Sequence, residues 1–520
     1  MGRKNIWKPF LYSLLVAGGM LIGYRIHKDL YPQQELLSRQ RTETKIDTLL
    51  QLIQKRYVDS ISTDKLLDVA IRKLLEELDP HSAYMDRESL EEAQIALEGD
   101  FEGIGIQFYI VQDTIMVIHV FPGGPSEFAG LQAGDKIIKI DTLDVAGKGI
   151  TANKVVKLLR GKRGSTVNVT IVRSGIDSPL TFTIRRDVVH VSSIEAAFMI
   201  DDSTGYIRIS NFAQNTAGEL REALQELLMK GMKQLILDLR GNPGGYLQIA
   251  VQVADEFLPG RKLVVYTEGR NHKRQEFYTS RKGLFEKGKL VVLIDEGTAS
   301  AAEILASALQ EWGRAILVGR PTFGKGLVQE QYMMPDKSAV RLTVARYYTP
   351  SGRSLQKPYK SPLVESKDSA TKTFFITPAG DTLYHEGGVQ PDIYVEPDTS
   401  LLLNPLLHKL SAKGSLVQFA YQYASKYGNK LKREYGDPEV FADEWHPDDS
   451  FKRYFLSWLK QNGISVTKEE LERYGEPVFN LIKAHIARQL WGSDGFYIVR
   501  SRHDPAIKKA LEVLSKTNLS

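Results

Sequence analysis

Apolar and polar positions alternate along this chain with two different periods, and the changes of period divide it into regions. Between residues 31 and 97 apolar residues recur every three or four positions, which predicts helices. Residues 399–520 have the same spacing and carry an aromatic stripe, which is more typical of a helical core than of a binding surface. From residue 191 to residue 398 short apolar runs alternate with amphipathic stretches, so this region is predicted to be an α/β domain.

The most informative stretch of the α/β region begins at Leu290. An apolar run, Leu290–Ile294, leads into a turn of small residues, and an Ala-rich amphipathic segment, Ala301–Trp312, follows. This pattern predicts a strand, a tight turn and a helix, with Ser300 at the helix N-terminus. Free backbone N–H groups and the positive end of the helix dipole favour a developing negative charge there. Ser300 is therefore a candidate nucleophile for acyl transfer.

A purely structural interpretation of Ser300 is also open. Ser300 and Glu303 fit the S-x-x-E capping box, in which the serine only caps the helix and the glutamate reaches back to it. Taken alone, these residues favour the structural interpretation, because short motifs match often by chance.

Lys325 favours the catalytic interpretation of Ser300 over the structural one. It lies between two glycines after the next apolar run, and Gln329 follows four residues later. A lysine in such a place is usually solvated, because burying an ammonium group costs free energy. If it is buried instead, its pKa falls, and the neutral amine can take a proton from a serine hydroxyl. None of the ten histidines lies in the glycine-rich turns of this region, so the sequence gives no support to a Ser-His-Asp triad.

Composition limits the other function classes. The chain has 520 residues with ordinary globular composition, which suggests several domains, and its net charge is only +5 with basic and acidic residues interleaved. Nothing therefore indicates nucleic-acid binding. The absence of cysteine excludes disulfides, cysteine nucleophiles and thiolate metal sites.

Residues 1–30 are predicted to be an export element. Three basic residues precede an apolar stretch from Pro9 to Tyr24, and Arg25 and Lys28 follow it. The stretch is short for a membrane-spanning helix, and no clear cleavage site follows it. We favour an uncleaved signal anchor over a cleaved signal peptide, with the bulk of the chain outside the cytoplasmic membrane.

Residues 98–190 resemble a PDZ domain. Gly103, Ile104, Gly105 and Ile106 lead into alternating apolar positions, and the segment A-G-L-Q-A-G-D at 129–135 precedes a predicted strand. In PDZ domains the glycine-rich loop binds a terminal carboxylate through backbone N–H groups, and the peptide pairs as an added strand. The resemblance implies that Gly103 to Ile106 form this loop.

The chain from about residue 35 to residue 398 resembles the carboxy-terminal processing (tail-specific) proteases, which use a Ser-Lys dyad. The similarity lies in T-A-S-A-A-E-I, in F-G-K-G and in the glutamine after it, with a further L-D-P-H-S segment at 78–82. It implies that Ser300 is the nucleophile, Lys325 the general base and Gln329 the residue that orients the lysine. His81 stays outside the predicted site, because a histidine in an Asp-Pro turn more often has a structural role.

The same resemblance assigns the oxyanion hole to the amide after the nucleophile, Ala301, and to a glycine of the turn D-L-R-G-N-P-G-G at 238–245. Two glycines at the end of a strand can expose backbone N–H groups to a substrate. Either Gly244 or Gly245 fits, and the sequence does not decide between them.

The prediction is a multidomain α+β protein. It comprises a signal anchor or signal peptide (1–30), an N-terminal helical region (31–97), a PDZ domain (98–190), an α/β protease core with a strand-turn-helix nucleophile site (191–398) and a C-terminal helical domain (399–520).

The predicted function is an exported, membrane-anchored (periplasmic) serine endopeptidase. It would bind protein substrates by their C-terminal tails, without a metal or cofactor, and residues 399–520 would support a homodimer. The alternative is a catalytically inactive PDZ scaffold of the cell envelope.

Overall fold

The computed structural model describes residues 19–20, 45–173, 175–359, 374–384, 387–412 and 414–516. It divides into two compact units, Met1–Lys73 and Leu74–Ser520. The described part of the first unit contains the helix α2 (Lys45–Arg56) and most of α3 (Thr63–Glu76), which continues into the second unit. Apart from Gly19 and Met20, the predicted signal segment lies outside the described residues.

The predicted PDZ region forms an antiparallel sheet with two short helices. The strand order is β3-β4-β5-β7-β8, and β6 pairs with β5. The bounds are β2 (Asp100–Gly103), β3 (Ile106–Val111), β4 (Thr114–Val120), α5 (Pro125–Ala129), β5 (Lys136–Ile140), β6 (Leu143–Asp144), α6 (Ala152–Leu159), β7 (Thr166–Val172), β8 (Leu180–Arg185) and β9 (Asp187–His190). The strand β3 ends the order and pairs only with β4, so it leaves one edge free. The strands β2 and β9 pair with each other where the chain enters and leaves this sheet.

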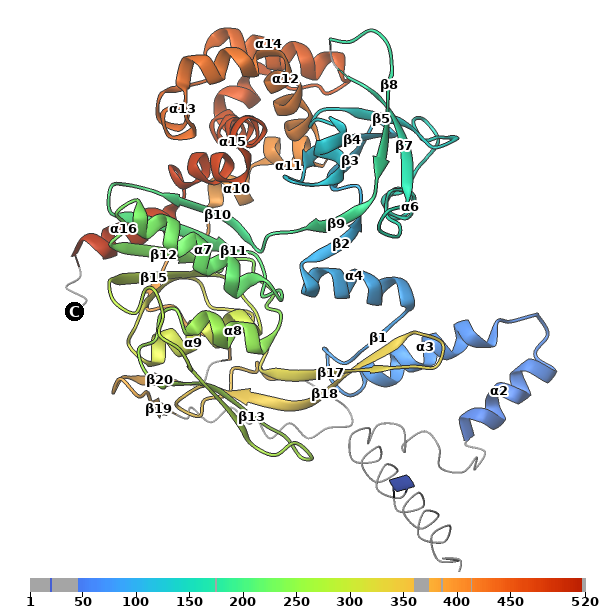
Figure 1. Cartoon of the computed structure of the whole chain (residues 1–520), viewed down its shortest axis with the longest axis vertical. Helices are drawn as coiled ribbons and strands as arrows, with labels where there is room; N and C mark the ends of the chain where they lie inside the picture. Colours follow the sequence, from blue (N-terminus) through green and yellow to red (C-terminus); the bar gives the residue numbers. More distant parts are fainter. Residues whose placement is uncertain are drawn as a thin grey trace, which may run out of the picture. The chain divides into compact units, whose positions relative to one another are not determined.

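The predicted protease core is built on a six-stranded sheet with the order β10-β11-β12-β15-β16-β21, in which only β10 is antiparallel to its neighbour (Figure 1). Its strands are β10 (Ile194–Met199), β11 (Thr204–Ile209), β12 (Gln234–Asp238), β15 (Lys289–Ile294), β16 (Ile316–Gly319) and β21 (Ile393–Tyr394). The helices α7 (Thr216–Met229), α8 (Leu247–Ala254) and α9 (Ala301–Glu311) connect them.

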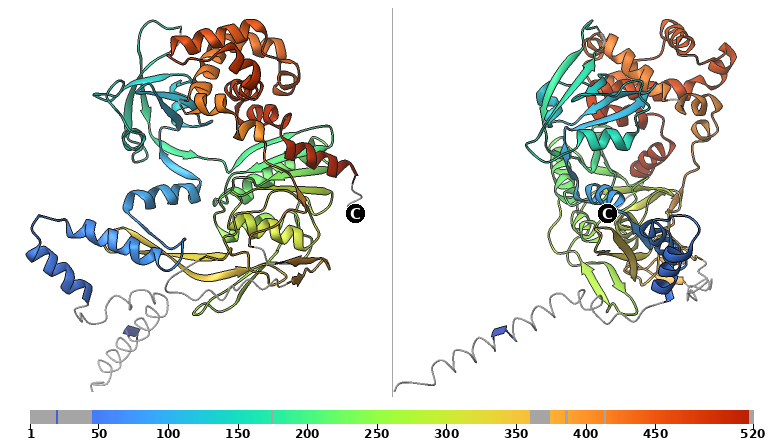
Figure 2. Two further views of the ribbon diagram at one scale, coloured as in Figure 1. Left: turned by 180° about the vertical axis from the view of Figure 1, so that it is seen from behind. Right: turned by 90° about the vertical axis from the view of Figure 1, so that its right-hand side faces the viewer.

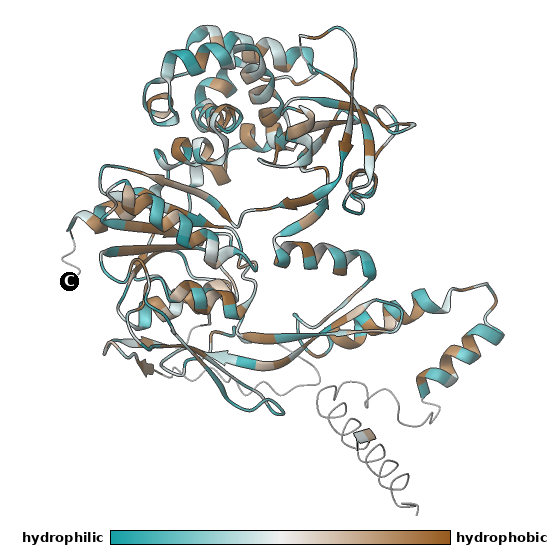
Figure 3. Ribbon diagram, in the orientation of Figure 1, coloured by the Kyte–Doolittle hydropathy of each residue, from teal (hydrophilic) through white to brown (hydrophobic). Residues whose placement is uncertain are grey.

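Both faces of this sheet are buried. Alternate residues of β15 point to opposite sides: Leu290, Val292 and Ile294 pack with α7, α8 and α9, whereas Val291 and Leu293 belong to the core of the C-terminal helices. The apolar run along β15 is visible in Figure 3. Parallel strands covered on both faces read as continuous apolar runs, which is why these strands were recognisable in the sequence.

The C-terminal helices form the second cover of the sheet. They are α10 (Thr399–Leu402), α11 (Pro405–Ser411), α12 (Ser415–Tyr435), α13 (Pro438–Glu444), α14 (Asp449–Gln461), α15 (Lys468–Ser501) and α16 (Pro505–Lys516). The helix α15 bends at Trp491 and Gly492, and α16 lies beside β12 and β15 (Figure 2). The predicted aromatic stripe is core, since Phe451, Phe455 and Trp458 are buried.

A second core sheet has the order β1-β18-β13-β14, with β17 also paired to β18. Its strands are β1 (Ala83–Met85), β13 (Leu263–Glu268), β14 (Gln275–Tyr278), β17 (Leu327–Met333) and β18 (Ala339–Tyr348), and the hairpin of β19 (Phe374–Ile376) and β20 (Thr382–Tyr384) stands apart. Between the turn at 78–82 and α4 (Arg87–Glu98) the sequence predicted no strand, yet β1 forms there and pairs with β18.

No helix among the described residues is long and apolar enough to cross a membrane.

Candidate active site

Three loops meet at the carboxyl ends of the adjacent parallel strands β12, β15 and β16. The loop after β12 is the glycine-rich turn 238–245, the loop after β15 ends at Ser300, and the loop after β16 contains Lys325. Open α/β sheets bind their ligands at this end of the strands. The order of the strands therefore brings together residues that are far apart in the sequence.

Ser300 lies at the N-terminus of α9 in a sparsely populated backbone conformation, with φ 54° and ψ −116°. A non-glycine residue in such a conformation costs about 1–3 kcal/mol and persists only where its surroundings impose it. The side chain is half-buried at the helix N-terminus. This geometry places a hydroxyl where backbone dipoles stabilise negative charge, as expected from the sequence.

Glu303 holds the Ser300 turn and the Lys325 loop together. Its fully buried carboxylate accepts the backbone N–H of Ser300 at 2.8 Å and that of Lys325 at 2.9 Å through Oε2. Through Oε1 it accepts the Gly324 N–H at 2.7 Å and the Thr322 hydroxyl at 2.6 Å. Burial raises the pKa of Glu303, and these four donors act in the opposite direction. The glutamate does reach back to Ser300 as in a capping box, but it also fixes the lysine loop.

Lys325 and Gln329 form the polar pair that the sequence predicted. Lys325 Nζ donates to Gln329 Oε1 at 2.8 Å, and Gln329 Nε2 donates to the backbone carbonyl of His81. Because a carbonyl can only accept, His81 fixes which end of the amide faces the lysine. His81 was left out of the predicted site; its side chain takes no part in these bonds, but its backbone carbonyl orients Gln329.

The turn 79–82 is held against β18 directly opposite Gln329. Gln329 pairs with Thr343 in the β17–β18 ladder. The Thr343 N–H donates to Ser82 Oγ at 3.1 Å, and the Thr343 hydroxyl donates to Asp79 Oδ1 at 3.1 Å. The L-D-P-H-S segment thus contributes position rather than chemistry.

The environment of Lys325 favours the neutral amine. Burial lowers its pKa, the positive charge of Arg341 lowers it further, and the charges of Asp79 and Glu303 act against this. A lysine must be neutral to act as a base. Among the described residues no hydrogen bond joins Lys325 Nζ to Ser300 Oγ, and catalytic hydrogen bonds are often long before a substrate binds.

Tyr347 is a further polar group beside Ser300. Its side chain is 2% exposed, and its hydroxyl has no hydrogen-bond partner among the described residues. Burial holds the pKa of Tyr347 well above its usual value, and the charge of Glu303 raises it further, whereas the neighbouring Ser300 hydroxyl lowers it. The two hydroxyls are therefore close, although not in hydrogen-bond geometry. The sequence contained no signal for this residue.

The glycine turn lies against Ser300. A Cβ on Gly244 would come within 2.8 Å of Ser300 Cβ and within 2.9 Å of the Ala301 nitrogen, so only glycine fits. The Gly244 N–H donates to Asn242 Oδ1 at 2.8 Å, whereas the N–H groups of Gly245 and Ala301 have no acceptor among the described residues. Gly245 and Ala301 therefore have the amides that remain available to a substrate.

The predicted peptide-binding loop is far from these residues in the sequence and belongs to the antiparallel sheet. The carbonyls of Ile104 and Gly105 accept the N–H groups of Ser126 and Phe121. In a trans peptide the N–H points opposite to the C=O, so the N–H groups of Gly105 and Ile106 point away from these partners. Gly103, at the end of β2, pairs with Asp187 of β9.

Among the described residues no cluster of three or more histidine, aspartate or glutamate side chains could hold a metal ion.

Comparison with known proteins identifies four segments. Residues 203–366 match peptidase family S41, and residues 103–184 match the PDZ domain. Residues 17–89 match the N-terminal domain of the activating protease CtpB, and residues 406–492 match a family of unknown function (DUF8443). The fold and these matches define a serine peptidase with a PDZ domain.

Relatives of known name are similar over most of their length. A carboxy-terminal-processing protease of Bartonella bacilliformis is 37% identical over 59% of this chain and 71% of its own. The carboxy-terminal processing protease CtpA of Bacillus subtilis is 34% identical over 69% of this chain and 76% of its own. The chain belongs to the carboxy-terminal processing protease family. A solved photosystem II D1 C-terminal processing protease is 28% identical, with a TM-score of 0.36, and the match covers 68% of this chain and 87% of that chain.

Proposed function

We propose that this protein is an exported endopeptidase that binds the C-terminal tail of a protein substrate through its PDZ domain and cleaves the substrate with a Ser300–Lys325 dyad. The observation that carries the proposal is the buried carboxylate of Glu303, which accepts the backbone N–H of both residues. One group thus fixes the nucleophile and the base relative to each other.

In the first step Ser300 Oγ attacks the carbonyl carbon of the scissile bond, and its proton passes to Lys325 Nζ. The oxyanion is stabilised by the amides of Ala301 and Gly245, since the Gly244 amide already donates to Asn242. The lysine ammonium then gives its proton to the leaving amine, and the peptide bond breaks. Water, deprotonated by the same lysine, hydrolyses the acyl-enzyme and restores Ser300.

Gln329 acts as a positioning residue in this proposal. By accepting one N–H of the lysine, it leaves the lone pair of the neutral amine free to turn toward Ser300. Because His81 fixes the amide of Gln329, the lysine is oriented through two successive hydrogen bonds.

Tail binding is proposed for the loop Gly103–Ile106 and the free edge of β3. The Gly105 and Ile106 N–H groups face away from their own sheet, and a terminal carboxylate needs such donors. Membrane anchoring through residues 1–30, a periplasmic location of the catalytic part and self-association through residues 399–520 are proposed from the sequence pattern alone.

The test is hydrolysis of an unstructured reporter protein with an apolar C-terminal tail by the full chain. Ser300→Ala and Lys325→Ala should each reduce turnover about a thousandfold or more. Ser307→Ala is the matched control, because this buried serine lies on the same helix and donates only to the Ile304 carbonyl. Amidating the reporter's terminus should reduce turnover without abolishing it.

Turnover that survives in both dyad variants would contradict the assigned chemistry. Tail binding without turnover by the parent protein would instead support the inactive scaffold.

A further inference from the structure

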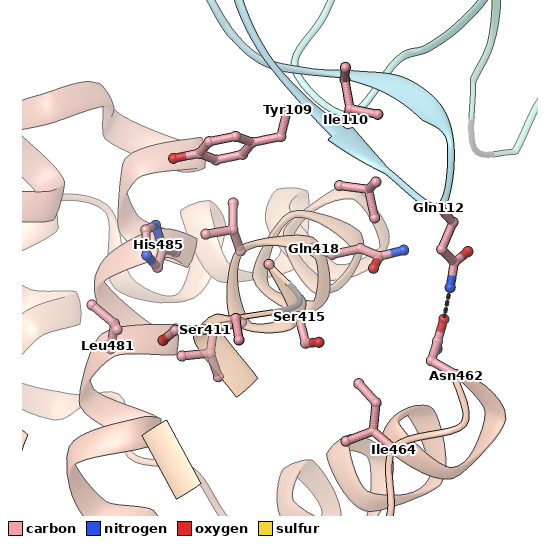
Figure 4. A pocket seen from close by; sticks show the side chains of 15 residues that line it. Tyr109, Ile110, Gln112, Ser411, Ser415, Gln418, Asn462, Ile464, Leu481 and His485 are labelled. Carbon is pink, nitrogen blue, oxygen red and sulfur yellow. Dashed lines mark hydrogen bonds between the residues drawn. The ribbon is translucent and has the colours of Figure 1, made fainter. Parts of the chain in front are cut away.

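A cleft of about 740 Å³ separates the end of β3 from the C-terminal helices (Figure 4). On one side Tyr109, Ile110 and Gln112 line it, and on the other side it is lined by residues of α11, α12, α15 and the segment after α14. Gln112 Nε2 donates to Asn462 Oδ1 at 3.1 Å and bridges the two sides. A second bridge joins Gln489 Nε2 to the Ala133 carbonyl at 3.1 Å.

The lining of this cleft contains polar and apolar side chains but no lysine, arginine, aspartate or glutamate. It combines amide and hydroxyl side chains, such as Gln418 and Ser415, with apolar ones, such as Ile464 and Leu481. His485 completes it. Burial and the charges of Arg488 and Arg500 lower the pKa of His485 to about 4, so this side chain is neutral near pH 7.

His485 has an unused hydrogen-bonding atom. Its Nδ1 is buried and has no partner among the described residues. Buried polar atoms are rarely left without a hydrogen-bond partner, so His485 Nδ1 is an exception among the side-chain atoms of the residues that line the cleft.

The free edge of β3 leads from the predicted carboxylate loop toward this cleft. Ile106 and Val120 form a non-hydrogen-bonded pair, because the Phe121 N–H donates to the Gly105 carbonyl. The backbone N–H and C=O of Ile106 therefore face away from β4. A tail whose carboxylate lies at the loop and whose backbone pairs with this edge must run antiparallel to β3.

The length of β3 determines which tail residues reach the cleft. Ile106 and Gln112 are six residues apart, which corresponds to about 20 Å of strand at about 3.4 Å per residue. The terminal residue of the tail would lie opposite Ile106. The residues about three to six positions before it would then lie opposite Tyr109 to Gln112, at the mouth of the cleft.

We propose that this cleft is an upstream subsite for substrate tails, in which the C-terminal helices and β3 together bind uncharged residues about three to six positions before the carboxyl terminus. The inference rests on the proposed tail binding by the PDZ domain and extends it to the helical region. A charged residue is disfavoured there because it loses hydration and no side chain of the lining carries an opposite charge. A residue with a hydrogen-bonding side chain can replace the bond between Gln112 and Asn462.

The experiment measures the affinity of fluorescent ten-residue peptides for the full chain carrying Ser300→Ala, solubilised in mild detergent. The peptides share their last three residues and have alanine, glutamate or lysine five positions before the terminus. Glutamate and lysine should each weaken binding about tenfold relative to alanine, and a tenfold change corresponds to about 1.4 kcal/mol. Changing the terminal residue or amidating it should abolish binding.

A charge introduced into the cleft should reverse this preference. Gln418→Lys should favour the glutamate peptide over the lysine peptide, and Gln418→Glu should do the opposite. Asn429→Lys is the matched control, because Asn429 is an exposed residue of the same helix outside the cleft. It should leave the order of the three peptides unchanged.

Three results would overturn the inference. If upstream charges and both Gln418 variants change affinity less than about twofold while the terminal residue still matters, the PDZ domain binds tails without the cleft. If the Gln418 variants weaken all peptides equally, the residue is structural. If they change sedimentation and not peptide affinity, the cleft is occupied by a second copy of the chain. Binding that is indifferent to the terminal residue would instead contradict the proposed tail recognition itself.

Discussion

Replacing Glu303 by glutamine tests whether one carboxylate fixes both the nucleophile and the base. Glutamine has the same shape but only one acceptor oxygen, and its NH₂ group can only donate. If the oxygen keeps the Ser300 and Lys325 amides, the NH₂ group faces the Thr322 hydroxyl and the Gly324 N–H. The hydroxyl can turn and accept, but the Gly324 N–H then has no acceptor. The opposite orientation would leave two backbone N–H groups without acceptors and is less favourable.

The loss of stability expected for Glu303→Gln follows from the number of N–H groups that lose their acceptor. One buried, unsatisfied N–H costs about 1–3 kcal/mol, so Glu303→Gln should lower the free energy of unfolding by that amount. Turnover should fall only moderately, since the backbone N–H groups of Ser300 and Lys325 both stay bonded to the side chain. Glu303→Ala removes all four acceptor contacts and should cost about 3–5 kcal/mol and most of the activity.

Urea unfolding and reporter turnover measure the two effects. The control is Glu311→Gln, because Glu311 is equally buried on the same helix but accepts from Arg353 and Ser351, away from the site. It should lose stability and, while folded, keep its turnover. If Glu303→Gln matched the parent in both assays, or if Glu311→Gln lost as much turnover, the reasoning about Glu303 would be wrong.

Three other predictions concern the neighbouring groups. Folding lowers the pKa of Lys325, so the protein is most stable above the unfolded pKa of this lysine and loses stability as the pH falls below it. Lys325→Met removes this loss. The variant should therefore have no turnover, yet its free energy of unfolding near pH 7 should be about 0.5–2 kcal/mol higher in urea titrations. The Tyr347 hydroxyl has no hydrogen-bond partner among the described residues, so Tyr347→Phe should leave the melting temperature unchanged within a few degrees. The same variant should lower kcat, and an unchanged kcat would exclude a role of this hydroxyl beside Ser300. Gly244 and Gly260 both have positive φ, but a Cβ on Gly244 would be crowded by Ser300, whereas Gly260 has open space around it. Gly244→Ala should therefore destabilise the protein by more than Gly260→Ala. Equal losses of stability in thermal unfolding would contradict this.

Much of the fold was predictable because its strands are either buried on both faces or alternate regularly. The sequence predicted a strand over the apolar run Leu290–Ile294, and β15 spans Lys289–Ile294. The helix expected from Ala301 to Trp312 is one residue shorter, because α9 ends at Glu311 and Trp312 caps it. Local periodicity does not determine where a helix gives way to turns.

The position of the C-terminal helices could not be predicted. Their apolar faces indicated helices but not a partner, and the partner is the second face of the core sheet, through residues such as Val291 and Leu293. The contact between the Arg240 guanidinium and Asp504, at 2.8 Å, likewise joins the turn 238–245 to the start of α16 across a long sequence separation. Pairings of this kind depend on the tertiary structure and leave no periodic signal.

The residues of the candidate site were predictable where their side chains have distinctive chemistry, but not where only a backbone group takes part. Ser300, Lys325 and Gln329 stood out by type and spacing. Glu303 was visible as part of a capping pattern, but its bonds to the lysine loop depend on how β15 and β16 pair. His81 contributes only its carbonyl, which any residue possesses, and Tyr347 comes to lie beside Ser300 only through the tertiary fold.

The proposed roles of Ser300 as nucleophile and Lys325 as base are tested most directly by labelling the full chain covalently with a fluorophosphonate. Mass spectrometry locates the labelled residue, and the rate of labelling is measured as a function of pH. We expect a single adduct on Ser300, formed at a rate that rises with pH to a midpoint below the usual lysine pKa, and near-complete loss of labelling in Lys325→Ala. An adduct on another residue, or a labelling rate that does not depend on Lys325, would contradict the assignment of Ser300 and Lys325 as nucleophile and base.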